Sequence, residues 1–496
     1  MKPQDFPEDI RPLLIPKPSG RMAYHCLGCG AESSIENLAY TCPECGAVML
    51  IEDREFDRLK KTPGEVWQRV FDFRKALNIP ALKGIFLFHE LVAPIIPLED
   101  VVYLGEGHTP LVAANRKSVE DAGAVFHFKN DGQNPSASFK DRGMASAVSY
   151  LNHLLNTGRA KKILAVCAST GDTSAAAALY ASYLGDQVSS AVLLPQGKVT
   201  PQQLSQPLGA GASVLEIPGV FDDCMKVVEK LAENYPVALL NSKNAWRILG
   251  QETYAYEIAQ SFDWDVADLA VIVPIGNAGN ITAVMSGFLK LHDLGLIKAL
   301  PRIMGVQSEH ADPVFRYYLE PESARRRFTP VRVKPSVAQA AMIGNPVSMP
   351  RVISLSERMR EVSGHELLVI RVSEQEIIDN MLTANRHGHV VCTQGGESLA
   401  GLKAAVEAGL LKADQQAVLD STAHMLKFID FQNMYYENTY PPEFGVCPRA
   451  ELINKPRLIR PENITAPSPE NPLEGEDLDR FVAETAGLVA RDLGLE

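Results

Sequence analysis

The sequence has no apolar run of the roughly 18–20 residues that a membrane-spanning helix needs. It has no excess of basic charge, because 48 Lys and Arg stand against 60 Asp and Glu, for a net charge of −12. Nucleic acid and anionic membrane surfaces would repel such a chain, so neither is expected as a partner. Eight cysteines in 496 residues are too few for a disulfide scaffold. Since residues 1–18 also lack the apolar core of a signal peptide, we expect a cytoplasmic protein.

The chain is long enough for two or three domains, and its central part has an alternating pattern. Short apolar runs at Ile163–Val166, Ser190–Leu194 and Leu269–Val273 predict buried strands of a parallel sheet. Proline-free, alanine-containing stretches at Ala175–Leu184 and Glu397–Ala408 predict helices. The repeated order of strand, glycine-containing turn and helix predicts an α/β fold with open sheets. In such folds ligands bind at the carboxyl ends of the strands.

The C-terminal part, residues 431–496, has a different composition. Eight prolines between residues 441 and 475 are too many for a central strand or a helix. Five apolar residues of the last segment share one helical face: Leu478, Phe481, Val482, Leu488 and Val489. We expect a proline-rich arm that ends in a helix and docks through this face on the catalytic body or on a second subunit. A disordered tail is the alternative.

Four cysteines form a compact pattern near the N-terminus, Cys26-x-x-Cys29 and Cys42-x-x-Cys45, with twelve residues between the two pairs. Two such turns place four thiolates around one point, which predicts a closed, structural zinc site. Four ordinary free cysteines are the alternative. Acidic residues surround the pattern, so we expect a folded appendage and not a nucleic-acid-binding module. The remaining cysteines are scattered, and core packing is expected for each: Cys167, Cys224, Cys392 and Cys447.

A lysine stands in the segment Asn134–Gly143, which reads as a turn entering a helix. A lysine there is usually a solvated surface residue. Small polar neighbours and a helix N-terminus are also what a lysine needs to react with an aldehyde, because a cationic, enclosed environment lowers the pKa of the amine. Lys140 is therefore a candidate for covalent cofactor attachment.

Two loops between a strand and a helix add candidate anion sites. Ala168–Ser174 supplies hydroxyls, a glycine and free helix amides, which suits a carboxylate. Pro274–Thr282 contains Gly276-Asn277-Ala278-Gly279-Asn280, whose glycines let the backbone approach a phosphate closely. Neither the G-x-x-x-x-G-K-[ST] nor the G-x-G-x-x-G nucleotide motif is present, so nucleotide-binding folds have little support.

These three segments, in this order, resemble the fold type II pyridoxal-phosphate enzymes, and among them the threonine synthase family. Further similar motifs are Pro195–Lys198, Asn241–Gln251, Cys392–Gly396 and Thr422–Lys427, so that the resemblance extends over roughly residues 100–430. It implies a large catalytic α/β domain formed by residues 61–139 and 251–430, and a small α/β domain at 140–250. A lead and zinc-ribbon-like segment at 1–60, and the arm at 431–496, would complete the chain.

The resemblance also implies roles for the cofactor-binding residues. Lys140 would hold pyridoxal phosphate covalently and later move protons. The loop Gly276, Asn277, Ala278, Gly279 and Asn280 would bind the cofactor phosphate. Thr393 would hydrogen-bond the pyridine nitrogen, and this neutral partner makes the ring a weaker electron sink, which suits elimination and replacement. Asp172 would lie beside the phenolic oxygen.

The remaining implied roles concern the substrate. Ser169, Thr170 and Thr173 would receive its carboxylate. The leaving phosphate would be bound by Asn241, Ser242, Arg247 and Lys198, although surface charge is the usual role of such an arginine and lysine.

Two positions depart from the family pattern. Asp172 stands where this branch usually has Asn, and a carboxylate there would need a shared proton. Ala137 stands where Gly is usual, so its methyl group either narrows the pocket or is accommodated.

The activity that the resemblance implies is conversion of O-phospho-L-homoserine and water to L-threonine and phosphate. A cysteate synthase-like replacement on O-phospho-L-serine with sulfite is the alternative within the same chemistry, since the substrates differ by one methylene group. A non-catalytic cofactor-binding or zinc-ribbon interaction protein is a third hypothesis. A homodimer is expected because family members are commonly dimers.

Overall fold

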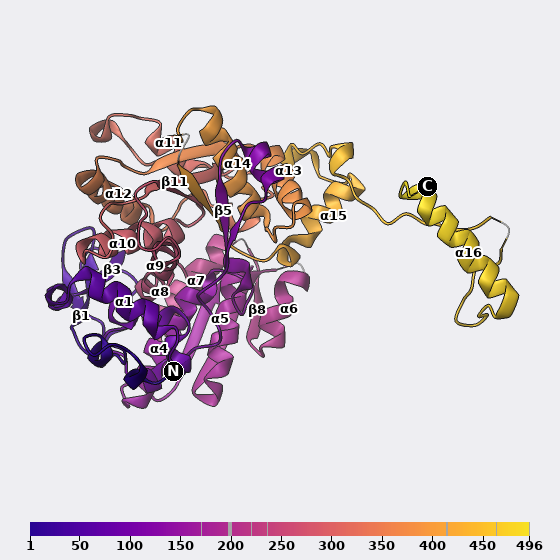
Figure 1. Ribbon diagram of the computed structural model, residues 1–496. Helices are drawn as coiled ribbons and strands as arrows, with labels where there is room; N and C mark the ends of the chain where they lie inside the picture. The colour runs from indigo at the N-terminus through magenta and orange to yellow at the C-terminus, as the bar shows by residue number, and fades with distance from the viewer. Residues whose placement is uncertain are drawn as a thin grey trace.

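The computed structural model describes residues 1–169, 171–196, 201–219, 221–235, 237–412, 415–462 and 464–495, and these residues form three β-sheets. Two are open α/β sheets and the third is a small antiparallel sheet near the N-terminus. Figure 1 shows helices packed around the two larger sheets, with the last helix standing apart from the rest of the chain.

The larger α/β sheet has six strands. In spatial order they are β12 (Leu368–Val372), β11 (Arg302–Ser308), β10 (Leu269–Pro274), β13 (Gln416–Ser421), β5 (Phe126–Asn130) and β4 (Leu111–Ala113). All pairs are parallel except β4 with β5, which is antiparallel. β10 is buried along its whole length, as its β-branched, apolar sequence predicts for a strand covered on both faces.

The smaller α/β sheet has four strands, all parallel. In spatial order they are β8 (Ser213–Ile217), β7 (Val188–Pro195), β6 (Ile163–Ala168) and β9 (Val237–Leu239). β6, β7 and β10 contain the three predicted strands, which are thereby confirmed. All four strands come from one continuous part of the chain, whereas domain boundaries at residues 140 and 250 stay a prediction.

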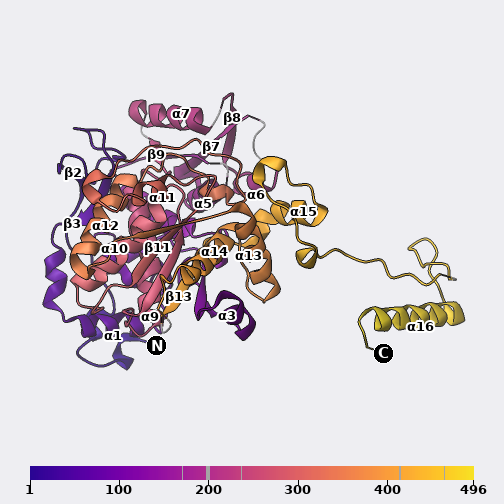
Figure 2. The same cartoon turned by 90° about the horizontal axis from the view of Figure 1, so that it is seen from above.

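Helices connect and cover the strands of both sheets (Figure 2). The helices before the first long strand are α1 (Gly64–Arg74), α2 (His89–Val92) and α3 (Arg116–Ala122). Those of the smaller-sheet region are α4 (Lys140–Asn156), α5 (Asp172–Tyr183), α6 (Pro201–Gly209), α7 (Phe221–Asn234) and α8 (Ala245–Gln251). The larger sheet is accompanied by α9 (Thr253–Ser261), α10 (Gly279–Asp293), α11 (Pro313–Tyr318), α12 (Met349–Ser363), α13 (Glu374–Arg386), α14 (Thr393–Glu407) and α15 (Ile429–Glu437). α5 and α14 confirm the two predicted helices.

Helices α4 and α8 pack unusually closely, and two glycines make this possible. A Cβ on Gly250 would lie 2.0 Å from the carbonyl oxygen of Arg142, and a Cβ on Gly143 would lie 3.0 Å from the Cβ of Arg247. Side chains at these two positions would force the helices apart. The contact brings the first turn of α4 next to α8, which positions two residues of the site described below.

The N-terminal sheet contains β1 (Met22–Cys26), with β2 (Glu32–Ser34) and β3 (Met49–Asp53) antiparallel on either side. Tyr24, Met49 and Ile51 are buried in the same hydrophobic core as residues of α4 and α8. The Tyr40 hydroxyl also accepts a hydrogen bond of 2.8 Å from the amide of Leu239 in β9. The expectation of an appendage was therefore wrong. The N-terminal segment is too small to form a hydrophobic core of its own, so it packs into the core that it shares with α4 and α8.

The C-terminal arm ends in the expected helix, α16 (Gly475–Asp492), but no residue of α16 is buried. Val482 on its apolar face is 55% exposed. An extended, proline-containing segment carries the helix away from the body (Figure 1). The prediction that this helical face docks on the catalytic body was wrong for this single chain, and docking on a second subunit stays a prediction. The first part of the arm does pack on the body, because Phe431, Tyr435 and Val446 are buried in the same core cluster as residues of β13 and α14.

Across the described ranges, none of the helices has both the length and the apolar character needed to cross a membrane.

Candidate active site

One cavity lies where the N-termini of four helices converge. Lys140 and Asp172 are the first residues of α4 and α5, Gly279 begins α10, and Gln394 is the second residue of α14. The lining residues are Phe139, Lys140, Asp172, Ser242, Arg247, Ile248, Gln251, Pro274, Gly276, Asn277, Ala278, Gly279, Asn280, Ala340, Ala341, Gln394 and Thr422. Helix N-termini carry partial positive charge and free amide groups, so the cavity favours an anionic ligand.

Lys140 projects into this cavity and is not the solvated surface lysine of the alternative hypothesis. Burial, reinforced by the charge of Arg247, lowers the pKa of its amine from 10.5 to about 7. Its Nζ lies 4.1 Å from the centroid of the Phe139 ring. A substantial fraction of this amine is therefore neutral, and nucleophilic, near pH 7.

Backbone pairing fixes the segment that carries Lys140. Ser138 forms an isolated antiparallel bridge with Ala423, and the amide of Phe139 donates to the carbonyl of Thr422 over 2.8 Å. The segment Asn134–Gly143 is thus paired with the motif Thr422–Lys427, although the two are far apart in the sequence. Ala137 has a positive φ of 63°, which an alanine adopts at an energetic cost and a glycine does not.

Arg247 is a buried cation without an acidic partner among the described residues. It is 3% exposed, its Nη1 donates to the carbonyl of Leu240 over 3.3 Å, and its Nε has no partner. Burial lowers the pKa of the guanidinium from 12.5 to about 10, so it stays charged at neutral pH. An isolated buried charge is costly, which indicates that an anion completes this part of the cavity.

The loop after β10 forms another wall. A Cβ on Gly276 would lie 2.9 Å from the Cα of Ala341, so only glycine fits at this approach. Ala278, which precedes the first residue of α10, has a φ of 61°. The side-chain amide of Asn280 donates to Asp420 Oδ2 over 2.6 Å. The loop consequently presents its backbone, and the start of α10, to the cavity.

Asp172 has a cationic partner. Lys427 Nζ lies 2.8 Å from Asp172 Oδ1 and donates to the carbonyl of Ser136 over 2.9 Å. The expectation of a shared proton is thus replaced by an ion pair, because the motif Thr422–Lys427 brings an ammonium group to this carboxylate.

Two residues at the start of α14 have polar atoms without partners. Thr393 is fully buried and its Oγ1 has no hydrogen-bond partner. Gln394 borders the cavity, and both polar atoms of its side-chain amide are likewise unpaired. Buried polar atoms are rarely left unpaired in native proteins, so the unpaired amide of Gln394 indicates a polar ligand in the cavity. Thr393 is not one of the lining residues named above.

Some predicted site residues lie away from the cavity wall. Asn241 is buried, and its Oδ1 accepts a hydrogen bond from the amide of Lys243 over 3.0 Å. Ser169 Oγ accepts one from Gly171 over 3.3 Å, and Thr173 lies half-buried in the first turn of α5. Thr170 and Lys198 lie outside the described residues.

Several cavity residues were not predicted from the sequence. Gln251, Gln394 and Thr422 stand in motifs that were recognised, but no role was assigned to them. Ala340 and Ala341 come from a short 3-10 helix, Gln339–Ala341, between α11 and α12, and nothing in their local sequence identifies them.

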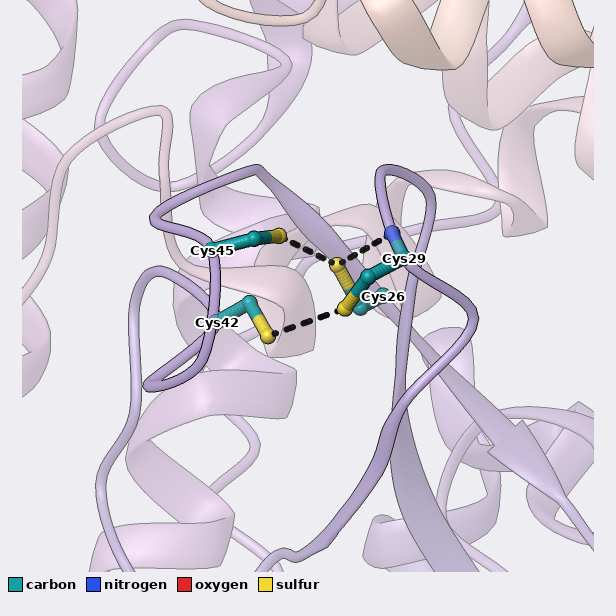
Figure 3. Close-up of side chains that lie close together, drawn as sticks. All are labelled: Cys26, Cys29, Cys42 and Cys45. Carbon is teal, nitrogen blue, oxygen red and sulfur yellow. Dashed lines mark hydrogen bonds between the residues drawn. The ribbon is translucent and has the colours of Figure 1, made fainter.

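The predicted cysteine quartet comes together in the N-terminal sheet (Figure 3). The sulfur atoms of Cys26, Cys29, Cys42 and Cys45 all lie within 4.8 Å of one another, with Cys26–Cys45 at 3.4 Å and Cys29–Cys42 at 3.7 Å. Sulfur atoms about 2.3 Å from a tetrahedral zinc are about 3.8 Å apart, so the arrangement fits this metal. Of the other cysteines, three are buried as expected, but Cys447 is exposed, so the expectation of core packing was wrong for it.

The cavity geometry agrees with the comparison with known families. Residues 102–421 match the family model described as pyridoxal-phosphate dependent enzyme. This match covers more than half of the chain, which therefore belongs to that family. Lys140 and all the other lining residues named above, except Thr422, lie within the matched range.

Relatives define the branch. Threonine synthase 2, chloroplastic, of Arabidopsis thaliana is 35% identical over 392 residues, which are 78% of this chain and 73% of that protein. The threonine synthase of Methanocaldococcus jannaschii is 34% identical over 82% of this chain and 93% of its own length. Within the pyridoxal-phosphate-dependent enzymes, the chain thus belongs with the threonine synthases.

Solved structures agree on the fold. Threonine synthase from Escherichia coli superposes with a TM-score of 0.61 at 21% identity, covering 82% of this chain and 90% of that one. The pyridoxal-phosphate-bound threonine synthase from Brucella melitensis gives 0.57 at 19% identity, with the same coverage of both chains. The predicted fold type II α/β architecture is confirmed.

Proposed function

We propose that the chain converts O-phospho-L-homoserine and water to L-threonine and phosphate. The observation that carries the proposal is the placement of a neutralisable lysine, Lys140, and an unpaired buried arginine, Arg247, in one cavity at four helix N-termini. The first group suits covalent cofactor attachment and the second suits a phosphorylated substrate. The threonine synthases among the relatives support this substrate over O-phospho-L-serine.

The residues present fit pyridoxal phosphate. Lys140 would hold its aldehyde, the Gly276–Asn280 loop and the start of α10 would hold its phosphate, and the unpaired hydroxyl of Thr393 would face its ring nitrogen. When bound, the cofactor supplies an electron sink that makes the substrate's α and β protons removable. Asp172, with Lys427, would adjoin the phenolic oxygen.

Lys140 Nζ has a pKa near neutrality, so it can both accept and return a proton at physiological pH. Ser242 and Arg247 would hold the phosphate group of the substrate, and the guanidinium can offer two parallel hydrogen bonds to its oxygens. Asn241 and Lys198 would complete this subsite. Fixing the phosphate there orients the bond that breaks and stabilises the negative charge that leaves.

The substrate carboxylate would bind at the N-terminus of α5. Ser169, Thr170 and Thr173 would supply hydroxyl groups, and the helix supplies amides and partial positive charge. The substrate would consequently lie with its carboxylate toward α5 and its phosphate toward α8.

We further propose zinc as a structural metal at Cys26, Cys29, Cys42 and Cys45, supported by the separations of the sulfur atoms. With four cysteine ligands the zinc would have no free coordination position, so it would not be catalytic. The free state of the described cysteines supports a reducing compartment such as the cytoplasm, although the Arabidopsis relative is named chloroplastic.

The test is a coupled measurement on the purified protein loaded with pyridoxal phosphate. O-phospho-L-homoserine should yield phosphate and threonine in equal amounts. Lys140→Ala should abolish both products, whereas Lys117→Ala, at an exposed position of α3, should leave them unchanged. Phosphate release only from O-phospho-L-serine, stimulated by sulfite, would overturn the proposal in favour of the alternative replacement reaction.

A further inference from the structure

Arg351, in the first turn of α12, links the cysteine site to the proposed substrate-phosphate subsite. It is fully buried, with 0% exposure. Its guanidinium donates to the carbonyl of Met49 from Nε over 3.0 Å and from Nη2 over 2.5 Å. It also donates to the carbonyl of Ser242 over 3.2 Å and to that of Lys243 over 3.1 Å. One side chain thus joins β3 of the N-terminal sheet to the loop that precedes α8.

The Met49 end of this link is held by the cysteine site. Met49 is the cross-strand partner of Cys26, one of the four cysteines, in the antiparallel pairing of β1 with β3. Just before β3 begins, the carbonyl of Val48 accepts a hydrogen bond from the amide of Leu27, which lies between Cys26 and Cys29. A metal held by the four sulfurs would therefore fix the position of the Met49 carbonyl.

The other end of the link lies at the cavity. Ser242 lines it together with Arg247. Arg351 Nη1 also donates to Ser348 Oγ over 3.1 Å, and the amide of Ser348 donates to the carbonyl of Asn277 over 3.1 Å. Ser242 and Asn277 belong to different walls, so displacement of Arg351 would disturb two walls of the cavity.

From this connection we propose that the metal site supports the anion subsite through Arg351, which is a positioning residue: metal bound at the cysteines strengthens phosphate binding at Ser242 and Arg247. The proposal rests on the proposed function, because that function assigns the anion subsite. It adds that the N-terminal metal is energetically coupled to the substrate's phosphate group.

Arginine is required because its planar fork reaches separate carbonyls from three nitrogens. No acidic side chain pairs with it among the described residues, so its charge is balanced by backbone carbonyls and by the Ser348 hydroxyl. Burial, together with repulsion from Arg247, lowers its pKa to about 10. The link therefore depends on the positions of the bonded groups. If the Met49 carbonyl moves, the Arg351 guanidinium moves with it, and its hydrogen bonds to the carbonyls of Ser242 and Lys243 change.

The experiment measures the dissociation constant of inorganic phosphate by calorimetry, on the full-length holoenzyme with zinc bound and after removal of zinc by a chelator. In the wild type, zinc removal should weaken phosphate binding by about tenfold, which is a typical coupling between two sites. In Arg351→Met the same removal should change the dissociation constant by less than about twofold. Arg358→Met is the matched control, since Arg358 is on the same helix but half-exposed and paired with Asp293, and it should behave as the wild type.

Linkage requires the reverse effect as well: phosphate must strengthen zinc binding by the same factor. Zinc transfer to a chromophoric chelator should therefore be slower with phosphate present in the wild type and unaffected by phosphate in Arg351→Met. If circular dichroism shows that Arg351→Met does not fold, Arg351→Lys retains the charge without the fork and should still lose most of the coupling.

Equal phosphate affinity with and without zinc in the wild type would overturn the proposal. An undiminished zinc effect in Arg351→Met or Arg351→Lys would overturn the route through Arg351. If the zinc-bound wild type does not bind phosphate, the anion subsite of the proposed function fails as well. If instead the coupling is found but no threonine is formed from O-phospho-L-homoserine, only the proposed reaction fails.

Discussion

Lys427 and Asp172 form an ion pair of 2.8 Å at the edge of the cavity, although Asp172 lies inside the family-matched region and Lys427 lies beyond its end at residue 421. Asp172 begins α5, and Lys427 follows β13 in the turn Met425–Phe428. Their side chains are 5% and 17% exposed. The pair gives the Asp172 carboxylate a fixed charge partner.

Lys427→Met should lower kcat/KM by about tenfold or more, because it leaves the Asp172 carboxylate uncompensated in the cavity. Adding Asp172→Asn should recover most of the loss, since it removes the charge that became unpaired. Steady-state kinetics and the absorbance spectrum of the bound cofactor report both effects. If the double variant is as poor as Lys427→Met, the role of Lys427 is not charge compensation.

Cofactor attachment should depend on pH through Lys140. Only the neutral amine attacks an aldehyde, and the pKa of Lys140 is lowered to about 7 by burial and by Arg247. The rate at which the cofactor-free protein takes up pyridoxal phosphate should therefore rise with pH around a midpoint near 7. Arg247→Met removes a neighbouring positive charge and should move this midpoint to higher pH. Stopped-flow absorbance measures the rate, and an unmoved midpoint would contradict the assigned cause.

Ala137→Gly should stabilise the protein. The positive φ of Ala137 costs an alanine about 1–2 kcal/mol, while glycine gives back about 0.4–1 kcal/mol through its more flexible unfolded chain. The net gain should be about 0.5–1 kcal/mol. Urea unfolding measures it, with Ala177→Gly inside α5 as a control that should destabilise by about 1 kcal/mol.

A buried ionic network supports the helix that carries Lys140. Arg142 in α4 contacts Glu257 over 2.5 Å and Asp131 over 2.8 Å, and Lys129 contacts Glu257 over 2.6 Å. Although burial alone would raise it, the charges of Arg142 and Lys129 hold the pKa of Glu257 well below its usual value. Two cations and two carboxylates thus balance one another inside the protein.

Glu257→Gln should destabilise the protein by about 3–5 kcal/mol, because it leaves buried positive charge without its partner. Glu120→Gln, which breaks the exposed pair with Arg116 in α3, should cost no more than about 0.5 kcal/mol. Denaturant unfolding compares the two. Similar costs for both substitutions would show that the buried network contributes little.

Removal of residues 464–496 should leave the body intact, since no residue of α16 is buried. We expect the stability to change by less than about 0.5 kcal/mol and kcat/KM to stay the same. Unfolding and activity measurements on the truncated chain check this. A large loss in either would show that α16 docks on a second subunit.

The elements that the sequence predicts well are those with a strong local signal. β6 and β10 are fully apolar, β-branched runs, and α5 and α14 are alanine-containing with no proline inside. The arm was predicted less well, because an amphipathic pattern indicates a helix but not the surface on which it packs. Composition also could not show that Tyr24 and Met49 would join the main core.

For the candidate site, the motifs identified Lys140, Arg247 and the Gly276–Asn280 loop, which all line one cavity. The remaining features depend on contacts between distant segments, such as Lys427 with Asp172. Ala340 and Ala341 contribute only by being small, and this property has no local signature. Such features follow from the topology of the sheets and not from any local pattern.

The position of β13 in the larger sheet has a consequence for protein synthesis. This strand is the last of the sheet to leave the ribosome, yet it lies between β10 and β5, and Ala423 just beyond it pairs with Ser138. A nascent chain that ends before this point has a sheet split in two and lacks the segment that positions Lys140. Pyridoxal phosphate should therefore be taken up only after translation has passed Lys427, so that cofactor acquisition marks an almost completed chain.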